Sequence, residues 1–538
     1  MKPTKYALYP LCCAVLLFTS CAKDEETVNP IVTEGISSVS LVSNQVVDEP
    51  ISITSTVAKD QVIGSSVEVF VDAQSIYTAK DQANISLNID PEAYTAGTHT
   101  LKISLTTKDG ITSTKEVVFS VQRRLITINL PTDMVNQYII NAVVFASKMD
   151  GSLITAKQYT TDDRTITLSS ATEFGPEEEF MLTFAQTDNG SATGMSTHAN
   201  LTRSNPGTIN LTKPFRGQVG EEKTYAIANF NSDDYITSHN INEPYNSDYR
   251  VELNAASGDF TVTMIDDIDM DTNDPEIFYM YGYNYTGFST EYAYLTLYPP
   301  LPDDFVLDKA DFSTEGLETL SLTLNSSQDA DDNTAYLFIN GYWSAHDYDI
   351  NNFHLIYNRG QITAPGGTME YYLNTNFHDY RYWLSYQNYY AAGIGAPKTT
   401  YEIPSNTLDF TYANNTIDFA VTGTDHILGR IRLYDLNGAG PVYVWDITFD
   451  SKTTQSINLP QLPDEMEPSK LLGLYANNEL KVSSTELVSY EGILDYGEYL
   501  QKVIKDHKDP LKVSGGQELI YKGTGTYHDG PINDYRFH

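Results

Sequence analysis

Tyrosine and tryptophan side chains recur in two segments of the chain, mostly at alternate positions, a spacing that aligns side chains on one face of a β-strand. The first segment carries Tyr279, Tyr281, Tyr283 and Tyr285, and the second carries Tyr380, Tyr382, Tyr386 and Tyr390. Rigid aromatic rings can stack on sugars or pack against a protein partner at low entropic cost. The candidate ligand-binding residues are Tyr281, Tyr283, Tyr285, Trp343, Tyr382, Trp383 and Tyr386. The alternative is a core face, because tyrosine is a favoured strand residue.

An acidic loop between the two aromatic segments has oxygen-bearing side chains at nearly every second position. These residues are Asp267, Asp269, Asp271, Asn273 and Asp274, and a weaker set follows at Asp329, Asp331, Asp332 and Asn333. Such a loop can wrap a hard cation, so calcium is the one cofactor that the sequence suggests. The loop departs from the EF-hand pattern at Thr272 and Phe278, which replace the turn glycine and the bidentate glutamate. A solvated acidic loop is the alternative.

Histidine and aspartate are adjacent at three places, which raises the question of acid and base catalysis. The dipeptides are His346-Asp347, His378-Asp379 and His528-Asp529. Neighbouring strand residues point to opposite faces, so none of these dipeptides forms a dyad by itself. The sequence has no His-Glu-x-x-His zinc motif, no Gly-x-Ser-x-Gly elbow and no phosphate-binding glycine loop. We assign no catalytic residue, although a glycosidase-type carboxylate pair stays open because sequence alone cannot select one.

The first 26 residues have the features of an export address. Lys2 and Lys5 provide a basic start, Leu11 to Phe18 form a short apolar run, and small residues precede Cys21. This pattern resembles a bacterial lipoprotein signal over residues 1–20, although Phe18 stands where leucine is usual. The resemblance implies that Cys21 is acylated, with palmitate as one of its acyl chains, and becomes the new N-terminus. An ordinary secretory signal cleaved elsewhere is the alternative.

A charged cluster follows the cysteine directly and consists of Lys23, Asp24, Glu25 and Glu26. It is similar to the tag by which Bacteroidota send lipoproteins to the outer face of the outer membrane. The resemblance implies a lipid-anchored protein that faces the cell exterior, with residues 21–34 as its tether. A solvated linker is the alternative, because acidic residues also make linkers.

Cysteine content and charge limit the class of protein further. The three cysteines are Cys12, Cys13 and Cys21, so a cleaved protein would keep one, which excludes a disulfide framework and a zinc site built of cysteines. The chain has 33 Lys and Arg residues against 71 Asp and Glu residues, a net charge of −38. A field of this sign repels phosphate backbones, so we expect no nucleic acid partner. The 39 tyrosines favour strands over helices and predict an all-β fold.

Alternating apolar residues predict strands from residue 35 to residue 122, as at Val67, Val69 and Val71. The turn at 94–98, the Asp109-Gly110 hairpin and the closing strand 117–121 together resemble a bacterial immunoglobulin-like domain. The resemblance implies a β-sandwich, and such domains are often spacers without chemistry of their own.

The rest of the chain divides by pattern into three further β regions. These are a second sandwich at 123–216, a Tyr-rich β domain at 217–363, and a second Tyr-rich domain at 364–538 that includes a tail. The first of them has strand candidates at 125–130, 138–146, 165–168 and 180–185. The phrase Thr-Ile-Asn-Leu occurs at 127–130 and again at 208–211, which we interpret as the chemistry of strand ends rather than as a repeat. Residues 297–305 echo 459–466, which hints at duplicated sandwiches.

One short C-terminal helix is predicted, because Leu500, Val503, Ile504 and His507 follow helical spacing and Pro510 comes where a helix would stop.

These patterns together predict tandem immunoglobulin-like sandwiches on a lipid anchor. We expect a non-catalytic surface protein that binds a glycan or another protein, with a role in adhesion. An extracellular polysaccharide hydrolase and a purely structural spacer are the two alternatives. The expected partners are the membrane, through the N-terminal lipid, and a glycan or surface protein.

Overall fold

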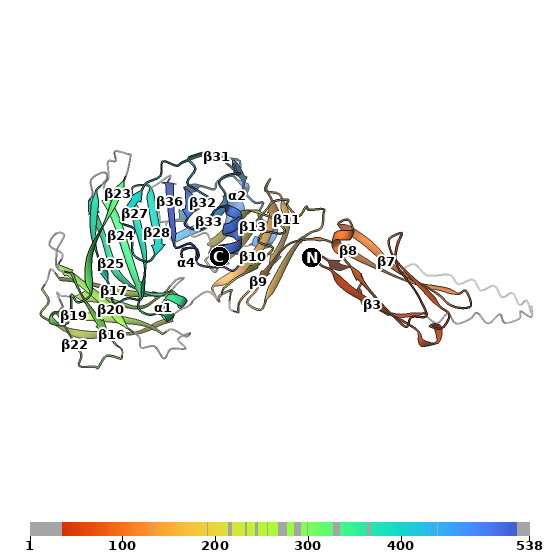
Figure 1. Cartoon of the computed structure of the whole chain (residues 1–538), viewed down its shortest axis with the longest axis horizontal. Helices are drawn as coiled ribbons and strands as arrows, with labels where there is room; N and C mark the ends of the chain where they lie inside the picture. The colour runs from red at the N-terminus through yellow and green to blue at the C-terminus, as the bar shows by residue number, and fades with distance from the viewer. Residues whose placement is uncertain are drawn as a thin grey trace, which may run out of the picture. The chain divides into compact units, whose positions relative to one another are not determined.

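The computed structural model describes residues 35–523 apart from 133, 191, 213–217, 232–233, 243–245, 255–256, 267–276, 285–291, 299, 326–333, 363–366, 438–439 and 468 (Figure 1). Strands dominate the described part of the chain, which confirms the predicted all-β class. The chain forms two compact units, one built from residues up to Asp90 together with Thr98–Ser120, the other from Pro91–Gly97 together with Val121 onward.

The N-terminal unit is a β-sandwich of one three-stranded and one five-stranded sheet. The small sheet has the order β1 (Ile36–Val39), β3 (Ile51–Val57), β6 (Asn84–Ile89). The large sheet has the order β2 (Gln45–Val47), β8 (Thr112–Val121), β7 (Gly97–Thr106), β4 (Ser66–Val71), β5 (Gln74–Lys80). Val67, Val69 and Val71 are buried between the sheets, as their alternation predicted.

The second unit repeats one strand arrangement along the chain, and its first copy spans residues 123–210. Its strands are β9 (Arg123–Asn129), β10 (Ile139–Lys148), β11 (Leu153–Gln158), β12 (Thr165–Ser170), β13 (Phe180–Asp188), β14 (Thr193–Leu201) and β15 (Thr208–Asn210). Strand β9 pairs antiparallel with β12 and parallel with β15, which makes a small sheet. Strands β11, β10, β13 and β14 form the second sheet in that order.

The same pairings occur in the next two copies. The second sandwich contains β16 (Gln218–Ala228), β17 (Asp234–Asn242), β18 (Asn246–Asn254), β19 (Asp259–Asp266), β20 (Phe278–Asn284), β21 (Tyr292–Leu297) and β22 (Val306–Asp308). The third contains β23 (Leu317–Asn325), β24 (Thr334–Tyr342), β25 (Asn352–Ile362), β26 (Thr368–Asn374), β27 (Asp379–Tyr386), β28 (Tyr389–Ile394) and β29 (Thr400–Glu402). In each copy the last strand runs parallel to the first.

The fourth sandwich keeps this plan except at one position. Its strands are β30 (Thr407–Ala413), β31 (Thr416–Thr422), β32 (Leu428–Asn437), β33 (Gly440–Asp450), β34 (Ser456–Asn458), β35 (Val482–Tyr490) and β36 (Gly516–Gly523). Here β30 precedes β31 in a hairpin and lies on the side of β31 that a parallel final strand takes in the other copies. Asn414 and Asn415 make this hairpin turn with φ of 53° and 59°, values that asparagine tolerates.

The recurring phrase Thr-Ile-Asn-Leu has a structural basis in the first sandwich. Thr208 pairs with Thr127, Ile209 with Ile128 and Asn210 with Asn129, so the two phrases lie side by side in parallel register. The Asn129 amide donates a hydrogen bond of 2.7 Å to the Asn210 side chain. The two echoing passages are not equivalent within the repeated plan: residues 297–305 connect β21 to β22, whereas residues 459–466 follow β34.

Hydrogen-bonded pairing between strands of different sandwiches joins the four sandwiches. Strand β14 pairs parallel with β33, β28 pairs antiparallel with β36, and β17 pairs with β25. The larger sheets thereby merge, and the smaller sheet of the second sandwich joins them because β18 also pairs with β19. Together they form one 19-stranded sheet, parts of which can be followed in Figure 1. The sheet crosses the boundaries expected at residues 216 and 363, so the division of this region into domains stays a prediction.

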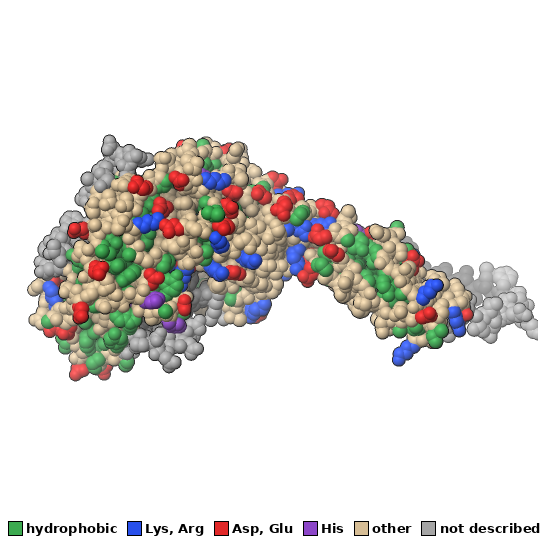
Figure 2. Space-filling model, viewed as in Figure 1, with side chains coloured by type: hydrophobic (Ala, Val, Ile, Leu, Met, Phe, Trp, Pro, Cys, Tyr) green, Lys and Arg blue, Asp and Glu red, His purple; other side chains and the backbone are tan. Residues whose placement is uncertain are grey.

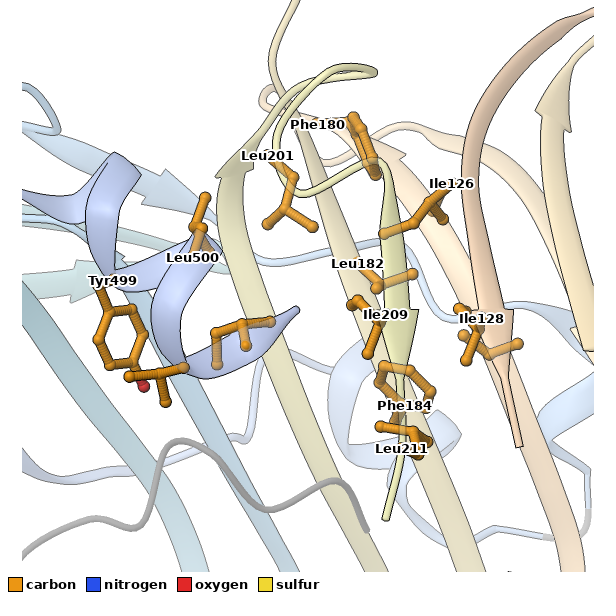
Figure 3. Close-up of a cluster of buried hydrophobic side chains, with 14 of the residues drawn as sticks. Ile126, Ile128, Phe180, Leu182, Phe184, Leu201, Ile209, Leu211, Tyr499 and Leu500 are labelled. Carbon is orange, nitrogen blue, oxygen red and sulfur yellow. The ribbon is translucent and has the colours of Figure 1, made fainter. Parts of the chain in front are cut away.

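The predicted C-terminal helix is present and completes a core. It consists of α3 (Tyr496–Tyr499) and a π-helical turn, η5 (Leu500–Ile504). Leu500, Val503 and Ile504 pack in one cluster with residues of the first sandwich, as Figure 3 shows for Leu500 and Tyr499 beside Leu201. The expectation that Pro510 ends this helix is wrong, because Pro510 instead begins α4 (Pro510–Ser514), where its missing N–H costs nothing.

Two further helices were not expected from the sequence. They are α1 (Ala345–Ile350) and α2 (Leu471–Ala476). Ser344 and Asp347 form a capping box at the start of α1, and the left-handed Asn351 ends it. Helices of six residues show too little apolar periodicity to be recognised in a sequence.

Candidate functional site

Several of the predicted functional residues lie outside the described residues. These are the signal and tether residues including Cys21, Lys23, Asp24, Glu25 and Glu26; the acidic sets Asp267, Asp269, Asp271, Asn273, Asp274 and Asp329, Asp331, Asp332, Asn333; Tyr285; and the dipeptide His528-Asp529. Lipidation and calcium binding therefore stay predictions. Within the described residues, no group of three or more His, Cys, Asp or Glu side chains could hold a metal ion.

Three of the tyrosines expected on an exposed binding face are buried instead. Tyr281 is 1% exposed, Tyr382 3% and Tyr386 1%, and all three belong to the core of the third sandwich. Tyr281 stacks on Tyr292 with ring centroids 5.0 Å apart. The expectation of an exposed face is wrong for these residues, because their side of the sheet packs against β23, β26 and β29. Tyr283 lies in β20 opposite Tyr292.

The candidate Trp343 and Tyr390 of the second aromatic segment differ in position. Trp343 is half-buried and packs edge-on against Phe377, with ring centroids 5.2 Å apart, so it supports the same core. Tyr390 lies on the opposite face of the sheet from Tyr382. The hairpin between β27 and β28 pairs Tyr390 with Ser385, so Tyr390 is not in line with the buried tyrosines. A turn inside a segment therefore breaks the alternation on which the expectation rested.

Trp383 is the predicted residue that does reach the outer face, where it meets two aromatic residues that sequence reasoning missed. Phe338 on β24 lies directly across from Trp383 on β27. Tyr336 follows two positions away on the same face of β24, opposite Ser385. Tyr336 is 50% exposed, Phe338 is 36% exposed and Trp383 is half-buried. We call Tyr336, Phe338 and Trp383 the aromatic row.

The sequence of β24 explains why this row exists. Ala335, Leu337 and Ile339 are fully buried against the smaller sheet, so the residues between them must point outward. A strand with one solvated face normally alternates apolar and polar residues. Here Tyr336 and Phe338 break that alternation. The uninterrupted apolar run at residues 335–339 was the sequence signal that could have revealed the row.

A buried ion pair fixes one end of the aromatic row. Arg381 lies on the same face of β27 as Trp383, and its guanidinium carbon is 5.5 Å from the Trp383 ring centroid and 5.7 Å from that of Phe353. Its Nη1 donates a 2.5 Å hydrogen bond to Oδ2 of Asp509, and the two side chains are 6% and 5% exposed. The guanidinium therefore contacts both rings and limits the positions open to Trp383.

Asp509 links this pair to the helix beside the sheet. Its Oδ1 accepts a hydrogen bond of 2.9 Å from the backbone N–H of Leu511 and so caps α4. Lys512, one turn along α4, lies 4.5 Å from the Tyr348 ring centroid and donates a hydrogen bond to the Tyr348 carbonyl. Helices α1 and α4 are thus tied together beside the aromatic row.

The His-Asp dipeptides inside the described residues do not form catalytic dyads. His346 and His378 are exposed, and Asp347 accepts hydrogen bonds from Ser344 in the capping box of α1. His354 is buried, and burial lowers its pKa to about 3 and keeps the ring neutral. Its ring lies 5.9 Å from that of Phe377, in the core.

Comparison with known proteins identifies the N-terminal unit. Residues 36–103 match the family model of the bacterial Ig domain. This part of the chain is therefore a bacterial Ig-like domain, which is a surface or adhesion-type domain. No curated protein matches the chain. Among the described residues, no helix is long and apolar enough to cross a membrane.

One solved structure gives a weak match to the chain. It is the crystal structure of dimeric latent PorU from Porphyromonas gingivalis, with 8% sequence identity and a TM-score of 0.10. The match covers 63% of this chain and 34% of that one, so the chain spans about a third of its length. A likeness at this level carries no argument about fold or function.

Proposed function

We propose that this protein is a surface lipoprotein that binds a glycan through the aromatic row and has no catalytic role. The observation that carries the proposal is the exposure of Tyr336 and Phe338 beside Trp383 on the outer face of the third sandwich. Aromatic side chains on the same face of adjacent strands offer apolar ring surface, and the sheet beneath limits their movement. Such a surface suits the flat face of a sugar ring.

The size of the aromatic row favours a glycan over a protein partner. A fully covered aromatic side chain buries about 150–250 Å². Three side chains exposed by half or less therefore offer at most roughly 300 Å², well below the roughly 800 Å² per partner that a stable protein interface buries. A short stretch of an oligosaccharide can bind to a surface of this size, because its hydroxyl groups also form hydrogen bonds with the protein.

In this proposal the N-terminal residues determine where the protein is located. Acylation of Cys21 would tether the chain, and the cluster from Lys23 to Glu26 would direct it to the outer face of the outer membrane. The bacterial Ig-like domain then serves as a spacer between the tether and the sandwiches that carry the aromatic row.

Affinity electrophoresis tests the binding role. The soluble chain beginning at Ala22 is run through gels that contain one polysaccharide each, and we expect retardation by at least one of them. Tyr336→Ala and Trp383→Ala should weaken that retardation, whereas Tyr138→Ala, which changes a tyrosine 59% exposed in the first sandwich, should not. Retardation that survives both row variants contradicts the proposal. Release of reducing sugar from the same polysaccharides would favour a hydrolase.

Palmitate labelling tests the anchor. Cells that express the full chain should incorporate labelled palmitate into it, and Cys21→Ser should abolish both the label and recovery in the membrane fraction. Replacement of Lys23, Asp24, Glu25 and Glu26 by Ala should keep the label but protect the protein from external protease on intact cells. Unchanged labelling of Cys21→Ser would mean that the signal has been misread.

A further inference from the structure

The residues directly across from the aromatic row on the neighbouring strands are uncharged. On β25, Asn358 pairs with Phe338 and Gly360 with Tyr336, and on β27 Ser385 pairs with Tyr336. Asn358 is exposed and Ser385 is half-buried. The amide and hydroxyl groups of these residues can donate and accept hydrogen bonds, which matches the hydroxyl groups of a sugar.

The positive charge beside the row is already neutralised. Arg381 is 5% exposed, and its guanidinium is paired with Asp509 at 2.5 Å. Proteins recognise carboxylate, sulfate and phosphate groups mainly through accessible arginine and lysine, often in bidentate geometry. Arg381 would have to leave both its carboxylate partner and the rings of Phe353 and Trp383 before it could serve an anionic ligand.

The charge of the whole chain also disfavours anionic ligands. With 71 acidic against 33 basic residues, the protein carries a net charge of −38, and acidic side chains are spread over the face shown in Figure 2. Such a field lowers the local concentration of anionic polymers and slows their association, most strongly at low ionic strength. An uncharged polymer meets no such barrier.

From these observations we infer that the aromatic row takes an uncharged polysaccharide and discriminates against acidic or sulfated ones. This inference rests on the proposed glycan-binding function and adds the ligand class. Stacking on Tyr336, Phe338 and Trp383 supplies the contact, and Asn358 and Ser385 supply hydrogen bonds. Discrimination comes from the lack of an accessible cation among the cross-strand neighbours of the row within the described residues.

Matched polysaccharide pairs provide the test, because each pair shares a backbone and differs in charge. Hydroxyethylcellulose is compared with carboxymethylcellulose, and dextran with dextran sulfate, together with uncharged galactomannan and xyloglucan. We expect retardation of the soluble chain by at least one uncharged polymer, with affinity unchanged between low and high salt. Tyr336→Ala and Phe338→Ala should each reduce the affinity at least tenfold, and Tyr138→Ala should leave it unchanged.

The outcomes separate the two proposals. Binding only to the charged member of a pair, abolished by Tyr336→Ala, overturns the inference about ligand class and keeps the glycan-binding function. Binding of neither class, by a chain shown to be folded by circular dichroism, overturns both. Asn358→Ala distinguishes hydrogen bonding from stacking alone: it should weaken binding to the uncharged polymer, and an unchanged affinity contradicts the role assigned to Asn358.

Discussion

Tyr382 and Trp383 are neighbours in the chain, yet they serve opposite sides of the sheet. Tyr382 is 3% exposed in the core of the third sandwich, whereas Trp383 is on the outer face beside Phe338. Aromatic composition alone does not distinguish these positions, because a strand can carry tyrosine on either face. The position of the smaller sheet decides which ring is core and which is available to a ligand.

The difference between a buried and an exposed tyrosine should appear in the stabilities of two alanine variants. Tyr281→Ala removes a ring that is 1% exposed and stacked on Tyr292, so we expect a loss of about 3–5 kcal/mol. Tyr336→Ala removes a ring that is 50% exposed, and we expect a change within about 1 kcal/mol. Thermal melts of the two variants check the prediction. Similar melting temperatures for both would mean that the two faces are assigned wrongly.

His354 should make stability depend on pH. Burial lowers its pKa in the folded state to about 3, below the ordinary value of 6.5. Between these values the unfolded state binds the proton and the folded state does not, so stability falls as pH decreases from about 6.5 toward 3. Below pH 6.5 the loss from this residue approaches about 1.4 kcal/mol per pH unit. Denaturant titrations of the wild type and His354→Gln should show a flatter pH dependence in the variant.

His346→Gln is the matched control for that experiment. His346 is exposed at the start of α1, so its replacement should leave the slope of stability against pH unchanged. A His354→Gln slope identical to that of the wild type between pH 6 and pH 4 would contradict the role assigned to burial.

At the scale of elements, the buried ion pair between Arg381 and Asp509 links α4 to the third sandwich. Breaking such a pair on one side leaves an uncompensated charge, which costs about 3–5 kcal/mol. Asp509→Ala should therefore destabilise strongly, because it also removes the cap of α4. Arg381→Met should destabilise the protein less than Asp509→Ala, because it leaves the cap of α4 in place. In the double variant the two losses of stability should be less than additive. A double-mutant cycle by chemical denaturation measures this coupling, and additivity within error would show that the pair is not coupled.

Strand positions could be predicted from sequence to a useful extent, but their partners could not. The segments 125–130 and 180–185 were expected as strands and match β9 and β13, because period two survives wherever one face is buried. Whether Tyr386 points to a core or to solvent depends on β23 and β26, which are distant in the chain. The aromatic row was missed for the same reason: Phe338 and Trp383 meet only through the pairing of β24 with β27.

The whole second unit is closed by contacts between its first and last sandwiches. Residues Thr193 to His198 of β14 pair in parallel with Tyr443 to Thr448 of β33. Trp445 is fully buried across this seam and donates a 2.8 Å hydrogen bond to Thr197. A strand edge that would be open to aggregation in an isolated sandwich is therefore covered by a segment some 250 residues later in the chain.

This seam predicts that residues 121–216 do not fold alone, although the sequence reads as a sandwich. Their core is completed by Leu428, Val488, Leu500 and Val503, which are all buried in the same cluster, and β14 would lose its partner along an entire edge. Residues 121–523 retain these contacts. We expect cooperative melting for 121–523, whereas 121–216 should aggregate or show poorly dispersed amide resonances, because its exposed apolar surface outweighs the contacts left to it. A well-dispersed spectrum and a cooperative melt of 121–216 would instead establish the boundary near residue 216 as a true domain limit.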